Sequence, residues 1–240
     1  VLLTDGSGEA GTVYLISKDE GATWQCKTAL SDEDTPPAAG ETSPIPSAAA
    51  DPAALSAIKA VLLGNAEFYE TGIRETLDIS RLNQAVSSDG AVTVKTTRFA
   101  IIDLDNDGMK EVVLRLQVNG NDDYGFEVLR YQDGVVYGYV MWYRSFNQLK
   151  ADGTFSFSSS AMDSGFGALS FTDQTCSVDK ITYSESSYDT GNNLSVSYFA
   201  NNKRVTQDKF DAAIKKQDEK PDAVWHDFTN DNIEIVLPGA

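Results

Sequence analysis

A central stretch of the chain, from Arg98 to about Phe199, alternates short apolar runs with turn residues. The runs are rich in Val, Ile, Phe and Tyr, and pairs such as Asp133-Gly134 and Asp152-Gly153 separate them. β-Branched and aromatic residues favour strands, and Asp-Gly pairs favour the tight turns of hairpins. The stretch therefore predicts an antiparallel meander, with strands at residues 99–102, 112–116, 126–131, 135–140, 167–171, 180–184 and 194–199.

Helical patterns flank these strands. One helix is predicted to begin at Asp51, as the N-cap, with Pro52 in the first helical position, and to stop at Gly64. Further helices are predicted at residues 77–86, at residues 207–217 and after Thr229. Helices grouped on either side of a run of strands predict an α+β fold. In this fold, an antiparallel β-meander sheet has helices at the N- and C-terminal ends of the main domain.

Residues 31–51 differ in composition from the rest of the chain. They hold four of the seven prolines together with Ala, Ser, Thr and acids, and Ile45 is their only branched apolar side chain. So little apolar surface does not offset the entropy of ordering the backbone. We therefore expect a linker at 31–51 between an N-terminal hairpin segment at 1–30 and the main domain at 52–240.

The charge balance excludes some classes of partner. The 240 residues carry 36 Asp and Glu against 19 Lys and Arg, a net charge of -17. This charge repels phosphate backbones, so no nucleic acid is expected as a partner. No apolar run is long enough to span a membrane, and the absence of a Met or a charged, apolar leader at Val1 predicts a trimmed chain or a mature product.

Two cysteines, Cys26 and Cys176, fit no metal-ligand spacing. Their pairing would close a long loop and stabilise the fold by about 4 to 5 kcal/mol in the chain-entropy model. Two ordinary thiols in a core are the alternative. The sequence leaves both possibilities open.

The most specific motif is the segment between the strands predicted at 99–102 and 112–116. Acids occupy its positions 1, 3, 5 and 9, and Gly108 occupies position 6. Calcium takes six to eight oxygen ligands, and alternate side chains of a tight loop can converge on one ion. The expected metal ligands are Asp103, Asp105, Asp107 and Glu111, with the main-chain oxygen of Met109. A solvated turn that uses Asp and Gly for their turn preferences is the alternative.

This loop is not an EF-hand, because Leu114 stands where an EF-hand has its bidentate Glu. It resembles the DxDxDGxxD/E calcium loops of FG-GAP and integrin propeller repeats. That resemblance implies that the acids at positions 1, 3, 5 and 9 are the ligands. The expected cofactor is thus a structural calcium ion that holds a β-hairpin together.

A second motif lies in the N-terminal segment. Ser17, Asp19, Gly21, Thr23 and Trp24 match SxDxGxTW, and the segment resembles the Asp-box of sialidases. The resemblance implies a structural hairpin turn without catalysis. A single copy does not build a propeller, which needs several blades.

The main domain resembles uncharacterised secreted proteins and lipoproteins of Gram-positive bacteria. The residues that carry the resemblance lie at 99–114, 125–139, 149–157 and 224–236. It implies a bacterial protein that is extracellular or at the cell surface, and no known activity.

Two functions remain as hypotheses. The chain lacks HExxH, GxSxG and the phosphate-cradling GxxxxGK[ST]. The leading hypothesis is a non-enzymatic module with a structural calcium site that binds glycan or cell-wall material. The alternative is a glycan-active hydrolase that uses a carboxylate pair.

Overall fold

The computed structural model describes residues 52–87, 90–160, 162–172, 174–188 and 190–237, with the backbone of four short strands nearer the N-terminus. The chain divides into two compact units, Val1–Pro46 and Ser47–Ala240, and the boundary falls inside the predicted linker. None of the helices in the described ranges is long and apolar enough to cross a membrane.

The first unit contains two antiparallel strand pairs. Strand β1 (Leu2–Thr4) pairs with β2 (Ala10–Thr12), and β3 (Tyr14–Ile16) pairs with β4 (Gln25–Lys27). The β3–β4 pair corresponds to the hairpin predicted around the Asp-box. The turn residues of that box, 17–24, lie outside the described residues.

A seven-stranded sheet forms one half of the second unit. Its order is β16-β7-β8-β9-β10-β5-β6, and its pairings are antiparallel except for the parallel pair β10–β5. Its strands are β5 (Phe68–Glu70), β6 (Glu75–Leu77), β7 (Val94–Ile102), β8 (Glu111–Val118), β9 (Asn121–Gln132), β10 (Val135–Trp142) and β16 (His226–Asp227).

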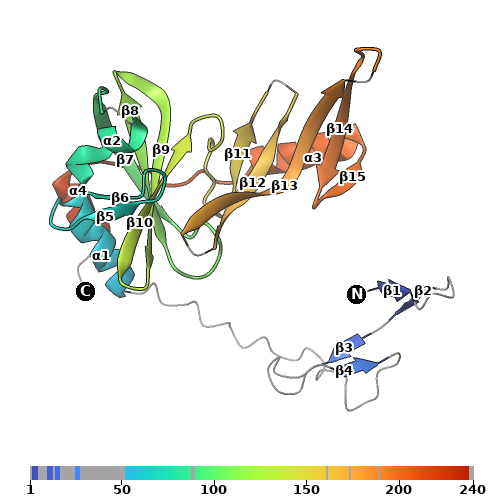
Figure 1. The fold of residues 1–240 in the computed structure, drawn as a ribbon, viewed down its shortest axis with the longest axis horizontal. Coiled ribbons are helices and arrows are strands. Elements are labelled where there is room, and N and C mark those ends of the chain that lie inside the picture. The colour runs from blue at the N-terminus through green and yellow to red at the C-terminus, as the bar shows by residue number, and fades with distance from the viewer. Residues whose placement is uncertain are drawn as a thin grey trace. The chain divides into compact units, whose positions relative to one another are not determined.

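Both faces of this sheet are covered. One face packs on α1 (Pro52–Leu62), with α2 (Leu82–Val86) and α4 (Asn230–Val236) completing the core, as Figure 1 shows. The other face packs on side chains that include Leu104, Phe146 and Phe155. A strand buried on both faces is apolar nearly throughout, which explains the nearly continuous apolar run of β8.

A five-stranded antiparallel meander forms the other half of the unit, and α3 (Gln207–Asp218) packs against it (Figure 1). Its strands, in sheet order, are β11 (Phe155–Ser158), β12 (Ser164–Thr172), β13 (Thr175–Tyr188), β14 (Leu194–Ala200) and β15 (Lys203–Val205). The unit is therefore mixed α and β with largely antiparallel sheets. The strands expected in one meander divide between two sheets.

Aromatic side chains join the two sheets. The rings of Phe146 and Phe155 lie 4.4 Å apart between centroids, and Tyr139 of β10 lies 5.3 Å from Phe171 of β12. Phe155 is fully buried. Pairs of this kind add about 0.5 to 1.5 kcal/mol beyond their buried area.

The helix expected at 77–86 is shorter than predicted. Leu77 ends strand β6, and a 3-10 turn covers Ile79–Arg81 before α2 begins. The side chain of Asp78 accepts a hydrogen bond from Ser80 N at 2.9 Å. This cap starts the helical segment after Asp78, so the apolar side chain of Leu77 packs from a strand.

Candidate metal centre

The acidic loop joins two neighbouring strands, as its sequence predicts. It spans Asp103 to Glu111, and the residue before Asp103, Ile102 of β7, pairs with Glu111 of β8. Asn106 and Gly108 have φ values of 58° and 90°. Backbone in this left-handed region suits Asn and Gly, which explains the tight bend at these positions.

The loop is held in place from inside. Leu104 is fully buried in the core between the sheets, and its amide donates to Oε2 of Glu111 at 2.9 Å. Gly108 N donates to Oδ2 of Asp103 at 3.1 Å, and Asp107 N lies 3.3 Å from Oδ1 of Asp105. Asp103, Asp105 and Glu111 therefore each accept a backbone hydrogen bond within the loop through one carboxylate oxygen, and the other oxygen of each is left for another partner.

Three of the four predicted carboxylates converge. Oxygen atoms of Asp103, Asp105 and Glu111 lie within 4.8 Å of one another. Two oxygens bound to one calcium ion at about 2.4 Å can be no more than about 4.8 Å apart. The three side chains therefore meet the distance limit for binding one cation.

Two oxygens of this cluster are buried without a hydrogen bond. Oδ1 of Asp103 and Oε1 of Glu111 accept none from the groups that the structure describes. Glu111 is 0% exposed. A buried carboxylate oxygen without a donor is costly and calls for a water or an ion, so the donor set fits a hard cation.

Asp107 takes a different direction. Its Oδ1 accepts from Met109 N at 2.7 Å, and its Oδ2 lies 2.9 Å from Nη2 of Arg130 on β9. Asp107 is therefore not one of the three clustered ligands. No described contact involves the predicted main-chain ligand of Met109.

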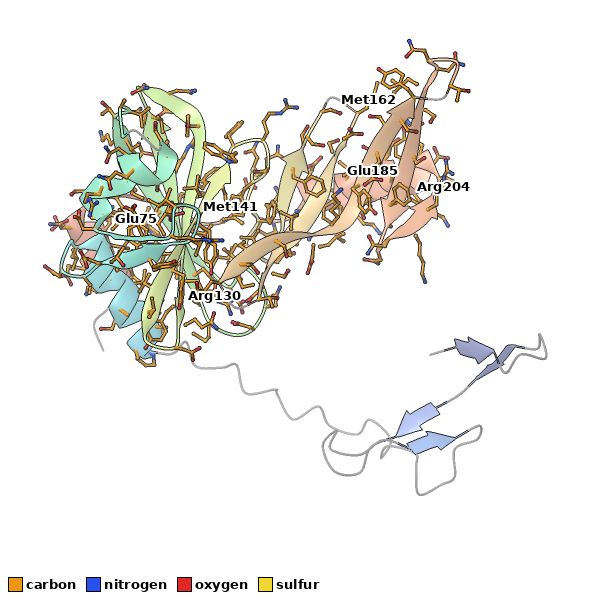
Figure 2. The ribbon with its side chains drawn as sticks, in the orientation of Figure 1. Glu75, Arg130, Met141, Met162, Glu185 and Arg204 are labelled. Atoms are coloured by element: carbon orange, nitrogen blue, oxygen red, sulfur yellow. The ribbon has the colours of Figure 1, made fainter. Side chains whose placement is uncertain are left out.

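Arg130 of β9 is a neighbour of the loop that no sequence motif indicated. Its Nη2 lies 3.5 Å from Oδ2 of Asp105, and its Nε lies 3.7 Å from Oε1 of Glu111. It lies where the seven-stranded sheet adjoins the end of the five-stranded sheet (Figure 2). A charged residue in the apolar run 126–131 was the available signal.

The electrostatics of the loop favour a further positive charge. Burial, and to a smaller extent the charge of nearby Asp105, raises the pKa of Glu111 to about 8, against the opposite effects of the Leu104 amide and of Arg130. Burial also raises the pKa of Asp105, with a contribution from Asp107. Three of the loop acids, Asp105, Asp107 and Glu111, face one guanidinium, and a divalent cation would offset the negative charge that the loop acids carry when they are ionised.

Cys176, on β13, carries a free thiol. Burial raises its pKa to about 12. The side chain of its proposed partner, Cys26, lies outside the described residues.

No protein-family model, curated protein or solved structure matches the chain.

Proposed function

We propose that this chain is an extracellular or cell-surface, non-enzymatic binding module whose folded state is stabilised by a calcium ion. The observation that supports it is the convergence of Asp103, Asp105 and Glu111 within 4.8 Å, with two buried oxygens that accept no hydrogen bond from the described groups. Asp107 and the main-chain oxygen of Met109 would complete the coordination once the Asp107 carboxylate turned from Arg130 towards the ion. An extracellular location suits weak calcium sites, which fill at about 0.1 to 1 mM calcium.

The ligand chemistry favours calcium over other metals. The donors are carboxylate oxygens, and hard oxygen donors suit calcium, magnesium and manganese better than zinc or copper. The loop contains no Cys or His, and the whole chain has one His. Calcium tolerates irregular sets of six to eight oxygens, whereas magnesium requires a near-ideal octahedron. An irregular loop with a buried Glu therefore suits calcium best.

The ion would act as a structural link. The loop connects β7 with β8, and Arg130 of β9 contacts three of its acids. Bound calcium would remove the repulsion among these acids and hold the three strands in register. Because calcium would bind the folded chain and not the unfolded one, it must raise stability.

The test is thermal unfolding in calcium and in chelator. A ligand at a hundred times its Kd stabilises by about 2.7 kcal/mol, or on the order of 5 to 10 °C in Tm for a unit of this size. Asp105→Asn should abolish most of this shift. Asp211→Asn, an exposed residue on α3, removes the same charge away from the loop and should leave the shift intact.

An equal Tm in calcium and chelator for the unsubstituted chain would overturn the proposal. A shift that survives Asp105→Asn and Glu111→Gln would place the ion elsewhere. Magnesium in place of calcium should give a much smaller shift.

A hydrolase with a carboxylate pair is the second candidate. Glu70 of β5 and Glu127 of β9 are two buried carboxyl groups, 1% and 0% exposed, and burial raises the pKa of both. Glycosidases hold their two carboxyls about 5 to 9 Å apart on either side of an accessible substrate. Two carboxyl groups buried in the core, out of reach of a substrate, do not fit this arrangement, which favours the binding module.

A further inference from the structure

A groove opens on the second unit, away from the buried carboxyls of the core. Its volume is about 510 Å³, within the range of small-molecule sites, about 300 to 1,000 Å³. Its lining includes Arg115, Tyr143, Gln148, Lys150, Asp222 and Trp225. A second hollow of about 430 Å³ shares Tyr143 and Gln148 with it and continues along β11 and α3.

The walls of the groove are held by backbone hydrogen bonds between distant segments. Ala223 N donates to the carbonyl of Leu149 at 2.9 Å, and Asn147 exchanges two backbone hydrogen bonds with Ser156 at 2.9 and 2.7 Å. The lining therefore keeps its shape without a ligand. Preorganisation of this kind reduces the entropy lost on binding.

Gln148 lines both hollows with an unfavourable backbone. The φ of Gln148 is 49°, and its side chain is exposed. Its backbone N donates a hydrogen bond to Oδ1 of the Asn147 side chain at 2.7 Å. A residue other than Gly in the left-handed region is strained by about 1 to 3 kcal/mol, and such strain gathers at functional sites. Asn147 and Gln148, which both carry an amide side chain, thus stand next to each other in the lining of both hollows.

The charges of the groove cancel. Arg115 and Lys150 supply two positive charges, and Asp218 and Asp222 supply two negative ones. Lys150 is buried, and its Nζ donates to Oδ1 of Asp222 at 2.7 Å and to the carbonyl of Asp218 at 3.2 Å. The lining thus has no net attraction for an anion, and the chain as a whole, at -17, repels anions.

Three aromatic rings, those of Phe126, Tyr143 and Trp225, complete the lining. Trp225 and Tyr143 are half-buried, and Trp225 rests on Phe126 with ring centroids 5.9 Å apart. An aromatic ring offers an apolar face, and amides, carboxylates and amines around it offer donors and acceptors. A ligand that fits has apolar C–H faces and many hydroxyl groups, each of which donates and accepts.

We propose that this groove binds a neutral saccharide chain, with Trp225 and Tyr143 against sugar faces and Gln148, Asn147 and Asp222 bonded to hydroxyls. The proposal deepens the proposed function, because it names the ligand class of the binding module. The groove and the calcium loop consist of different residues, so each can fail without the other.

The test is isothermal titration calorimetry of the full chain with neutral and charged oligosaccharides. The neutral probes are chitotetraose, cellotetraose, mannotetraose and maltotetraose, and the charged probe is tetragalacturonate. We expect one class of neutral probe to bind with a micromolar to millimolar Kd and the charged probe to bind at least about tenfold more weakly, because the chain repels anions.

The decisive variant is Gln148→Gly. Glycine relieves the left-handed strain, so Tm should stay or rise, while loss of the amide should weaken saccharide binding about tenfold. Asn201→Gly is the matched control, because Asn201 has a φ of 48° in the β14–β15 turn. It should leave binding unchanged. Trp225→Leu should abolish binding while retaining an apolar contact with Phe126.

No binding by any neutral probe, or full affinity in both Gln148→Gly and Trp225→Leu, would overturn the saccharide site. Preference for tetragalacturonate would overturn the neutral assignment. Calcium-dependent Tm shifts measured on the same samples report on the loop alone, so loss of one property with the other intact identifies which proposal fails.

Discussion

The guanidinium carbon of Arg130 lies 4.5 Å from the centroid of the Phe171 ring, so a cation from the seven-stranded sheet rests on an aromatic face of the five-stranded sheet. The same side chain faces the loop acids Asp105 and Asp107. Contacts of this kind contribute about 0.5 to 2 kcal/mol. Arg130 therefore links the proposed ion site to the junction between the two sheets.

Arg130→Met should destabilise the chain in chelator and strengthen its calcium binding. Without the guanidinium the loop acids repel one another, and we expect a loss of about 1 to 3 kcal/mol, as for hydrogen bonds to charged groups. Calcium then meets one less positive charge, so its Kd should fall. Unfolding in urea and calcium titration by calorimetry measure the two effects.

The control for that change is Arg204→Met. Arg204 is exposed and donates to Oγ of Ser197 at 2.9 Å, far along the chain from the loop. It should leave calcium affinity unchanged. A higher Kd in Arg130→Met would contradict competition between Arg130 and calcium, and would instead make Arg130 a support that orients the ligands.

Glu127→Gln should remove a pH dependence of stability. Burial raises the pKa of Glu127 well above 4.5, and the neighbouring Glu70 raises it further. The folded state thus holds a proton that the unfolded state releases above that value. Stability contributed by this group falls as pH rises, by about 1.4 kcal/mol per pH unit until the folded pKa is reached.

Unfolding in urea and chelator at about pH 5, 6 and 7 measures this slope. The Gln side chain has a hydrogen-bond donor and does not titrate. The slope of unfolding free energy against pH should therefore become less negative by about 1.4 kcal/mol per pH unit. Glu185→Gln, an exposed partner of Lys180, should leave the slope as it is. Parallel pH profiles for the unsubstituted chain and Glu127→Gln would refute the raised pKa of Glu127.

Gly153→Ala should destabilise both the groove and the loop. Gly153 has a φ of 81°, and a Cβ there would lie 2.6 Å from the carbonyl oxygen of Asp103. Its amide also closes the turn that begins at Lys150, with a 3.0 Å bond to the Lys150 carbonyl. Overpacking costs about 1 to 3 kcal/mol, and we expect a smaller calcium-induced Tm shift.

Gly134→Ala separates the cost of backbone strain from the cost of the steric contact that Gly153→Ala makes with Asp103. Gly134 has a φ of 88° with no atom within 4 Å of the added Cβ, so the substitution carries the backbone strain alone. It should cost less than Gly153→Ala and leave the calcium response unchanged. Equal losses in the two variants would show that the approach to Asp103 is unimportant.

Cys176 should react slowly with iodoacetamide in the folded chain. Burial raises its pKa to about 12, and the thiolate is the reactive form. In a Cys26→Ser background, alkylation at about pH 8 should be many times slower in buffer than in urea, because unfolding restores a pKa near 8.5. Equal rates would place this thiol in water.

Local patterns predicted much of the fold. The helix that begins at Pro52 follows from its start signal, and α1 matches it closely. The helix predicted at 207–217 corresponds to α3, although the side chain of Thr206 makes no capping hydrogen bond. Seven of the twelve strands in the two sheets, β7 to β10 and β12 to β14, correspond to the predicted β-branched runs, whereas β5, β6, β11, β15 and β16 were not predicted. The division into two sheets and the parallel β10–β5 pair could not be predicted in this way, because they depend on contacts between distant segments.

The metal centre was partly predictable from the sequence, because its clustered acids all lie in one short loop. Asp103, Asp105 and Glu111 stand at ligand spacing within nine residues, and the loop brings them together. Asp107 has the same spacing, yet Arg130 of β9 draws its side chain away. No spacing rule within the loop contains that arginine.

The sequence alone determined the helices, most strands and the acidic bend, because capping, periodicity and turn preference act between neighbours in the chain. Only the tertiary structure decided which acids converge, which cation opposes them and which residues line the groove. Arg115, Gln148 and Trp225 meet there because two sheets and a helix pack together, and packing depends on the complementary surfaces of whole elements rather than on adjacent residues.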